Sequence, residues 1–418
     1  MKRFLFLSGF ILLSIKIFAI WILIPMDDKQ NNHLKAYGIT YWAIEQHFPA
    51  YWLLNYRGGS FLISYDKSVE DRCIIRGVSY EIISDAQKQA IFDYIARPDV
   101  NMDKVKLEKA PKIAVYAPPT YQPWDDAVML VLTYAEIPYD RIYDEEILRG
   151  DLSKYQWLHL HHEDFTGQYG KFWAAYKNTQ WYKNQVAQAE AEAHKLGYKK
   201  VSQLKLAVAK AIRQYVANGG YLFAMCSATE TLDIALAAQN TDICASVFDG
   251  DPADPQANQK LDYSQTFAFT NFKVITDPYV YAHSDIDVTS TRHVNENEDY
   301  FTLFDFSAKW DPIPTMLCQD HTKIIHGFMG QTTAFRLDKI KPGVLIMGEF
   351  KAAGEARYIH GTLGKGMWTF YGGHDPEDYR HMVGDPPTNL DLHPHSPGYR
   401  LILNNVLFPA AKKKKRKT

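Results

Sequence analysis

The chain has 418 residues, of which 46% are hydrophobic and 22% are charged, and its formal net charge is -2. A chain of this length can bury large cores in about two to three domains. The balanced charge excludes a domain-wide basic surface, so nucleic acid is not an expected partner, and the basic tail at 411–418 is expected to be solvated.

The four cysteines include no Cys-x-x-Cys pair, which excludes a zinc ribbon and a thioredoxin-type redox motif. In an oxidising compartment some of them could form disulfides, but their spacing does not say which. They are Cys73, Cys226, Cys244 and Cys318.

The N-terminal segment, residues 1–26, has the features of a signal peptide or a membrane anchor. Lys2 and Arg3 precede an almost wholly apolar run from Phe4 to Ile24. An apolar core of about 7–15 residues followed by a small residue, here Ala19, is typical of a cleaved signal, whereas about 20 apolar residues can span a bilayer. We therefore expect an exported protein, either free outside the cytoplasm or anchored in the membrane by this segment and facing the periplasm.

Residues 27–105 are predicted to form a small α+β region. A helix is expected over 31–46, and two strands at 51–56 and 61–63 flank a Gly-Gly turn. Ser84 is typical of a helix N-cap, and the helix that follows is expected to continue through Ile95.

Predicted strands and helices alternate in the α/β domain expected over 106–410. Such alternation is typical of an open, doubly wound, mostly parallel sheet with helices on both faces, as in flavodoxin-like folds. Ligands bind at the carboxyl ends of the strands in these sheets, so the side chains that follow the strands are candidate site residues. The expected strands are 113–117, 141–143, 157–161, 221–225 and 366–371, with a hairpin at 343–350 and 356–359 in a strand-rich region over 265–350, and the expected helices are 125–137, 171–196, 201–215 and 229–237.

The strand predicted at 221–225 runs directly into Cys226, and the next helix begins at once. A sharp strand-to-helix turn exposes a nucleophile above a sheet, and a helix N-terminus favours the thiolate. Free cysteines are also often simply buried. Cys226 is therefore a candidate nucleophile, with a structural cysteine as the alternative.

Three histidines and a carboxylate occur where the strand predicted at 157–161 ends. On a strand, His159 and His161 share one face, and His162 points to the other. A His-x-His pair on a strand can bind zinc with a carboxylate such as Glu163 as a third ligand. The alternative is a polar strand end whose histidines are hydrogen-bonded within the protein.

The strand predicted at 366–371 is followed by two glycines and then by His374, Asp375 and Glu377. An imidazole beside a carboxylate can serve as the base for a cysteine nucleophile. Gly-Gly and Asp-Pro are also ordinary turn signals, so a plain turn is the alternative.

The order of these segments resembles the class I glutamine amidotransferase-like superfamily over roughly residues 112–409. The resemblance implies that Cys226 is the nucleophile, that His374 is its base and that Glu377 orients His374. It also implies a substrate-binding side at the neighbouring strand ends. The residues expected there are His161, His162, Glu163, Ser227 and Asp375.

The whole chain is also similar to a bacterial family of exported or membrane-anchored proteins commonly labelled asparagine synthetase B, through segments 53–60 and 158–170. A glutamine-dependent asparagine synthetase begins with Met-Cys and has a Ser-Gly-Gly-x-Asp-Ser loop for ATP. Here the second residue is Lys2 and no such loop occurs. The motifs therefore do not support ATP-dependent chemistry.

The leading hypothesis is an extracytoplasmic amidotransferase-like enzyme or amide hydrolase that uses Cys226, needs no cofactor, and acts on a small molecule or glycan. Backbone N–H groups at the turn would stabilise the oxyanion. One alternative is a non-catalytic domain that binds a ligand or glycan at the membrane. Another is a metal-dependent hydrolase. The metal ligands of that last alternative would be His159, His161, Glu163 and His374.

Overall fold

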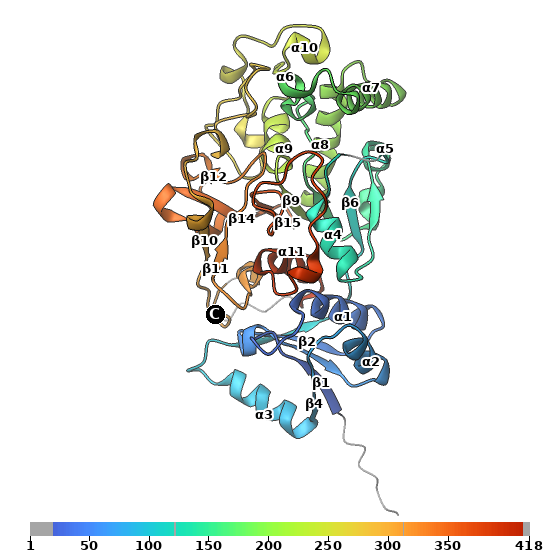
Figure 1. Ribbon diagram of the computed structural model, residues 1–418, viewed down its shortest axis with the longest axis vertical. Helices are drawn as coiled ribbons and strands as arrows, with labels where there is room; N and C mark the ends of the chain where they lie inside the picture. Colours follow the sequence, from blue (N-terminus) through green and yellow to red (C-terminus); the bar gives the residue numbers. More distant parts are fainter. Residues whose placement is uncertain (1–19, 121–122, 312, 413–418) are drawn as a thin grey trace, which may run out of the picture.

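Two sheets organise the residues that the computed structural model describes, which are 20–120, 123–311 and 313–412. The smaller sheet, built from the N-terminal part of the chain, lies at one end of the long axis of the molecule, and the larger sheet lies beyond it (Figure 1).

The smaller sheet has strand order β4-β1-β3-β2-β5, and all its pairings are antiparallel. Helix α1 packs on one face against Trp52 and Phe61, and α3 packs on the other against Leu53 and Leu62. The strands are β1 (Ile20–Ile24), β2 (Ala50–Leu54), β3 (Phe61–Ser64), β4 (Glu81–Ser84) and β5 (Asp103–Leu107), and the helices are α1 (His33–Glu45), α2 (Lys67–Ile75) and α3 (Asp85–Ala96).

Strand β1 overturns the predicted signal peptide or anchor over residues 1–26, because residues 20–24 of that segment are part of this sheet. Ile22 and Ile24 join the core on the α1 side and Leu23 joins the core on the α3 side. The strand is apolar throughout because both of its faces are covered. The predicted span from Phe4 to Ile24, and with it the prediction of an exported or membrane-anchored protein facing the periplasm, is therefore wrong. Residues 1–19 lie outside the described residues.

Among the described helices, none combines the length and the apolar character that crossing a bilayer needs.

The larger sheet has strand order β11-β10-β13-β14-β15-β9-β8-β6-β7, with β12 paired to β14. The strands are β6 (Ile113–Tyr116), β7 (Asp140–Ile142), β8 (Trp157–Leu160), β9 (Tyr221–Met225), β10 (Tyr300–Leu303), β11 (Ile324–His326), β12 (Phe335–Arg336), β13 (Leu345–Phe350), β14 (Glu355–Leu363) and β15 (Gly366–Tyr371).

This sheet is mixed, so the predicted open, doubly wound, mostly parallel sheet is wrong. Neighbours from β7 to β15 on the path through β6, β8 and β9 are parallel. All pairings among β10 to β15 on the other side are antiparallel. The direction reverses because β14 and β15 form a hairpin through a tight turn, in which Gly364 has a φ of 60°.

Helices cover both faces of the larger sheet. Helices α4 and α11 share a core with the smaller sheet, whereas α5, α8 and α9 pack on the opposite face. The single helix predicted at 171–196 is divided into α6 and α7. The bounds are α4 (Ala127–Tyr134), α5 (Asp144–Leu148), α6 (Trp173–Tyr176), α7 (Gln180–Lys195), α8 (Val201–Ala217), α9 (Ala228–Ala237), α10 (Ser246–Asp249) and α11 (Pro397–Leu407).

Arg400 of α11 joins the two parts of the molecule. Its guanidinium is fully buried and donates hydrogen bonds to the Tyr37 hydroxyl at 2.9 Å, to the Met26 carbonyl at 3.3 Å and to the Gly58 carbonyl. A buried cation needs such partners. From the larger part of the chain, His321 Nδ1 at 3.3 Å and Asp320 Oδ1 at 3.9 Å also face the guanidinium.

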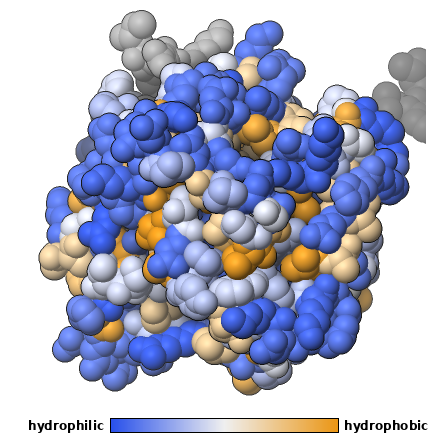
Figure 2. Space-filling model, turned by 90° about the horizontal axis from the view of Figure 1, so that it is seen from above, coloured by the Kyte–Doolittle hydropathy of each residue, from blue (hydrophilic) through white to orange (hydrophobic). Residues whose placement is uncertain are grey.

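Parallel pairing brings three strand ends to one edge of the larger sheet. Leu160 of β8 pairs with Ala224 of β9, and Met225 of β9 pairs with Tyr371 of β15. The residues that follow these strands therefore leave the sheet side by side, beneath α6 and α7 in Figure 1. Seen from above, this end of the molecule is mostly hydrophilic, with separate small apolar patches (Figure 2).

Candidate metal centre

A cavity of about 570 Å³ opens at these strand ends. Its wall contains His162, Cys226 and His374, which closely follow β8, β9 and β15, together with His381 from the loop after β15. Two further cavities, of about 490 and 330 Å³, also reach His162 and share Trp124 with it. The strand ends therefore form one continuous region of concave surface around His162.

Three imidazoles converge on this region. His161, His162 and His374 can each offer one nitrogen such that the three nitrogens lie within 4.8 Å of one another. The His161 and His374 ring centroids are 4.5 Å apart. Nε2 of His161, both ring nitrogens of His374 and Nδ1 of His162 are buried without a hydrogen-bond partner among the described residues, and Nδ1 of His161 faces the Asp126 carboxylate.

Two glycines bring His374 to this position. Gly373 has a φ of 99°, and a Cβ on Gly372 would lie 2.5 Å from the Thr333 carbonyl oxygen. Glycine is therefore required for the chain to turn sharply after β15. The sequence signal of a Gly-Gly turn thus places an imidazole above the sheet.

Asp126 supports His161 from behind. Its Oδ1 lies 3.3 Å from His161 Nδ1 and 3.3 Å from His159 Nε2, and it also caps α4 by accepting the Val128 and Met129 N–H groups. Burial by itself would raise the pKa of Asp126, but the two imidazoles hold it well below its ordinary value. A carboxylate on Nδ1 leaves Nε2 of His161 as the atom that can bind a metal.

Two of the three imidazoles, those of His162 and His374, are in the form that binds metal. Burial, together with the neighbouring imidazoles, lowers the pKa of His162 and of His374 well below 6.5. Both rings are therefore neutral near pH 7, and neutral imidazole is the ligand form of histidine.

The structure changes the metal ligand set expected from the sequence. His161 and His374 come together, but His159 lies fully buried behind them, with Nδ1 3.2 Å from the Phe223 carbonyl oxygen. Glu163 lines the two neighbouring cavities instead. The ligand that was missed is His162. Strand alternation excluded it, but β8 ends at Leu160 and the alternation does not continue.

Asp125 and His381, which were not predicted as site residues from the sequence, lie next to the three histidines. His381 Nε2 lies 2.8 Å from Asp125 Oδ1, and its Nδ1 lies 2.8 Å from Asp378 Oδ2. Burial lowers the pKa of His381, but these carboxylates outweigh it and raise the pKa to about 9. The pair Asp125-Asp126 was visible only as a helix start, and no local signal marked His381.

Cys226 lies at the sharp turn between β9 and α9, with a φ of 49°. Its thiol is buried, and this burial raises its pKa to about 11, although N–H groups of Gln331, Ser227 and Thr332 act in the other direction. Since neither ring nitrogen of His374 has a hydrogen-bond partner among the described residues, His374 does not act as a base hydrogen-bonded to this thiol here.

The side chains of the other predicted residues, Glu377, Asp375 and Ser227, do not form hydrogen bonds with Cys226 or His374. Glu377 pairs with His393 at 3.0 Å and does not orient His374. Asp375 is fully buried and accepts the Thr388 hydroxyl at 2.8 Å, so it holds a loop in place. The hydroxyl of Ser227 is buried without a hydrogen-bond partner in the described part of the chain.

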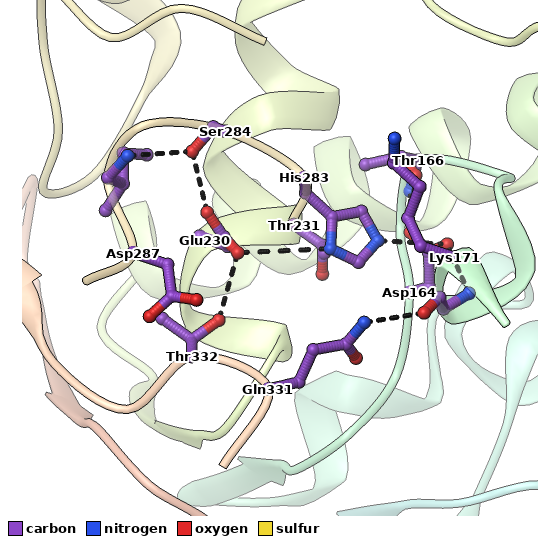
Figure 3. Close-up of polar contacts among 12 residues, drawn as sticks. Asp164, Thr166, Lys171, Glu230, Thr231, His283, Ser284, Asp287, Gln331 and Thr332 are labelled. Atoms are coloured by element: carbon purple, nitrogen blue, oxygen red, sulfur yellow. Dashed lines mark hydrogen bonds and ion pairs between the residues drawn. The ribbon is translucent and has the colours of Figure 1, made fainter. Parts of the chain in front are cut away.

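A buried acidic network lies next to the cavity (Figure 3). Glu230 of α9 accepts the Ser284 hydroxyl at 2.7 Å and the Thr332 hydroxyl at 3.1 Å, and its Oε1 is 3.9 Å from His283. Burial and the neighbouring Asp287 raise the pKa of Glu230 well above its ordinary value. The network fixes the segment from which Gln331 enters the cavity wall.

No family model matches the chain. A search of curated proteins also finds no match. The resemblance to glutamine amidotransferase-like proteins and to proteins labelled asparagine synthetase B therefore stays a prediction.

Solved structures give weak similarities only. Cytoplasmic protein STM3548 from Salmonella typhimurium is 10% identical, with a TM-score of 0.36, over 72% of this chain and 100% of its own. Cytoplasmic protein STM1381 from Salmonella typhimurium LT2 is 11% identical, with the same TM-score and coverage. Gan42B, a GH42 beta-galactosidase, is 11% identical, with a TM-score of 0.25, over 64% of this chain and 28% of its own. Similarities at these TM-scores carry no inference about the function of this chain.

Proposed function

We propose that this protein is a metal-dependent hydrolase that holds a divalent transition metal through His161, His162 and His374. The observation that carries the proposal is the convergence of the buried His161 and His374 with the half-buried His162, whose nitrogens lie within 4.8 Å of one another and include ring nitrogens without a partner among the described residues. Leaving a buried polar atom unpaired costs about 1–3 kcal/mol, and a bound metal removes that cost for each ligand.

The donor set suits zinc. Three imidazoles with a fourth position open to a cavity are typical of catalytic zinc sites, where the metal lowers the pKa of a bound water to about 7 and polarises the bond under attack. Imidazole also suits iron, copper and nickel, so a competition assay decides which metal binds best.

The cavity fits a small-molecule substrate with an apolar part. Phe172, Tyr176 and Tyr281 line one wall, and Lys171 and Arg380 contribute positive charge. Aromatic walls with a few polar groups are typical of small-molecule sites. Burial lowers the pKa of Lys171 to about 8, and its ammonium donates to the Ile275 and Asp277 carbonyls.

Hydrolysis through Cys226 is the second candidate. The positive φ of Cys226 and its place in the same cavity favour it. The high pKa of the thiol and the separation of Glu377 from His374 favour the metal centre instead.

The test is metal binding by the purified, metal-stripped protein. Titration with Zn²⁺ followed by elemental analysis after gel filtration should show tight binding by the wild type. His162→Gln should weaken that binding at least tenfold, since a neutral ligand is lost. His47→Gln, at an exposed position on the smaller sheet side, is the matched control and should bind as the wild type does.

Catalysis is tested separately with a panel of chromogenic esters and amides. Activity should disappear on metal removal, return on adding Zn²⁺, and be lost in His374→Gln. A metal-stripped protein that keeps full activity would rule out the proposal. Stoichiometric metal without any hydrolysis across the panel would rule out the hydrolase assignment but leave the metal site standing.

A further inference from the structure

We propose that a second divalent metal binds beside the first, held by Asp125, His381 and His374, so that the centre is dinuclear. The inference rests on the proposed function, because His374 belongs to both sites. The second site has its own ligands, however, and these can be tested without disturbing His161 or His162.

The second site rests first on convergence. Asp125, His374 and His381 can each offer one atom, and these atoms lie within 4.8 Å of one another. The His374 and His381 ring centroids are 4.5 Å apart, the same as the separation of His374 from His161. His374 therefore lies between the two ligand groups.

The second observation concerns polar atoms that lack hydrogen bonds. Both carboxylate oxygens of Asp125 and Nε2 of His381 are buried without a hydrogen-bond partner of proper geometry among the described residues. Asp125 Oδ1 and His381 Nε2 are nevertheless only 2.8 Å apart, and 1% of the His381 side chain is exposed. Both atoms also lie within 4.8 Å of a nitrogen of His374, so a divalent cation between them would be bound by all three groups, and the His381 ring would release its proton to solvent on binding.

Each of the two sites has a carboxylate behind one imidazole. Asp378 Oδ2 lies 2.8 Å from Nδ1 of His381, and Asp126 occupies the same place 3.3 Å behind Nδ1 of His161. Such a carboxylate fixes the tautomer and leaves Nε2 free to bind a metal. The same arrangement, a carboxylate beside Nδ1 of an imidazole, thus occurs at both proposed sites and supports two metal sites.

His374 can serve both sites because neither of its ring nitrogens has a partner among the described residues. Binding two metals at once forms one metal–nitrogen bond at Nδ1 and one at Nε2. The ring proton then leaves to the solvent as H⁺, and no electron is transferred. Two imidazoles and one carboxylate suit Zn²⁺, Mn²⁺ or Fe²⁺.

The experiment measures how many metals bind. Metal-stripped wild type is titrated with Zn²⁺ and, separately, with Mn²⁺, and the bound metal is counted after gel filtration. Two equivalents are expected, and the Mn²⁺ form should give an exchange-coupled electron paramagnetic resonance signal. Asp125→Asn and His381→Gln should each bind one equivalent and lose the coupled signal, while His47→Gln keeps two.

The outcomes separate this inference from the proposed function. One equivalent in the wild type, unchanged in Asp125→Asn and lost in His162→Gln, overturns the second site and keeps the first. Two equivalents in both Asp125→Asn and His381→Gln place the second metal elsewhere and overturn the inference. No bound metal in the wild type overturns both proposals. Circular dichroism of each variant shows whether it has folded.

Discussion

His374 is buried against His161 and His381, and neither of its ring nitrogens is hydrogen-bonded within the described residues. A buried imidazole without partners is costly, and burial keeps its pKa low. His374 therefore stabilises the folded protein only when a further group binds its ring nitrogens. A metal is the ligand that fits neutral imidazoles.

At the residue scale, Asp126→Asn tests how His161 is oriented. Asparagine keeps the cap of α4 but loses the negative charge 3.3 Å from His161 Nδ1. Zinc affinity should fall by about 10–100-fold, with a small change in the free energy of unfolding. Calorimetric titration and urea unfolding measure the two effects. Unchanged zinc affinity would contradict a role for Asp126 behind the metal ligand.

Cys226 gives a second prediction at this scale. Because its pKa is raised to about 11, the thiol is protonated at neutral pH, and iodoacetamide should label the folded protein slowly. The labelling rate should rise steadily as the pH increases toward 11, and His374→Ala should not change it. Fast labelling near pH 7 that His374→Ala slows would instead support a Cys–His catalytic pair.

At the scale of elements, the turn after β15 depends on Gly373. Alanine there would have to adopt a φ of 99°, and its Cβ would lie 2.4 Å from the Phe328 ring. We expect Gly373→Ala to cost at least about 1–3 kcal/mol of the free energy of unfolding, from strain alone, and to weaken zinc binding through His374.

The matched control for that turn is Gly343→Ala. Gly343 has a φ of 89°, but no atom would lie within 4 Å of an added Cβ. The difference between the two variants in urea unfolding therefore measures the clash with Phe328. An equal loss of the free energy of unfolding in both variants would show that the contact with Phe328 does not contribute to the cost of Gly373→Ala.

Helix α9 and the loop that faces it make folding depend on pH. Burial raises the pKa of Asp287 to about 7, whereas an unfolded aspartate titrates near 3.9. Between these pH values the folded protein keeps a proton that the unfolded chain releases. Folding stability should therefore fall as the pH rises from about 4 to 7.

Asp287→Asn tests this dependence, because asparagine does not titrate. Its free energy of unfolding should depend less on pH between 4 and 7 than that of the wild type. Asp305→Asn, an exposed aspartate, is the control and should keep the wild-type slope. Wild-type and Asp287→Asn curves that run parallel would contradict the raised pKa of Asp287.

At the scale of the whole molecule, Arg400 links the two sheets through its bonds to Tyr37, Met26 and Gly58. Arg400→Met would remove the donor from the Gly58 carbonyl and the Tyr37 hydroxyl and leave buried Asp320 without its cation, at about 1–3 kcal/mol for each buried group left unpaired. Thermal unfolding should show a lowered midpoint, and the two parts should lose their shared cooperativity. Arg97→Met, at an exposed position, should have little effect.

The local hydrophobic pattern was sufficient to predict many strands and helices of the fold. The apolar runs at 113–117, 157–161 and 221–225 are confirmed as strands, and the helical spacing at 201–215 is confirmed as α8. These segments are buried continuously or along one stripe, so the pattern follows directly from burial. The hairpin predicted at 343–350 and 356–359 is confirmed as the antiparallel pair β13 and β14. The shorter strands β10, β11 and β12 were not located individually because they lie between irregular segments.

The apolar run at the N-terminus shows the limit of such patterns. Ile20–Ile24 reads equally as the end of a membrane span or as a strand covered on both faces. Only its pairing with β3 and β4, strands encoded tens of residues later, decides between them.

The sequence by itself determined which residues follow the strand ends, including His161, Cys226 and His374, because strand ends can be located from local burial patterns. Only the tertiary structure decided which of them meet. His162, His381 and Asp125 reach the cluster through loop geometry and strand order, and Glu377 is turned away to His393. Distances between residues far apart in the chain depend on sheet order and loop paths, which no local periodicity encodes.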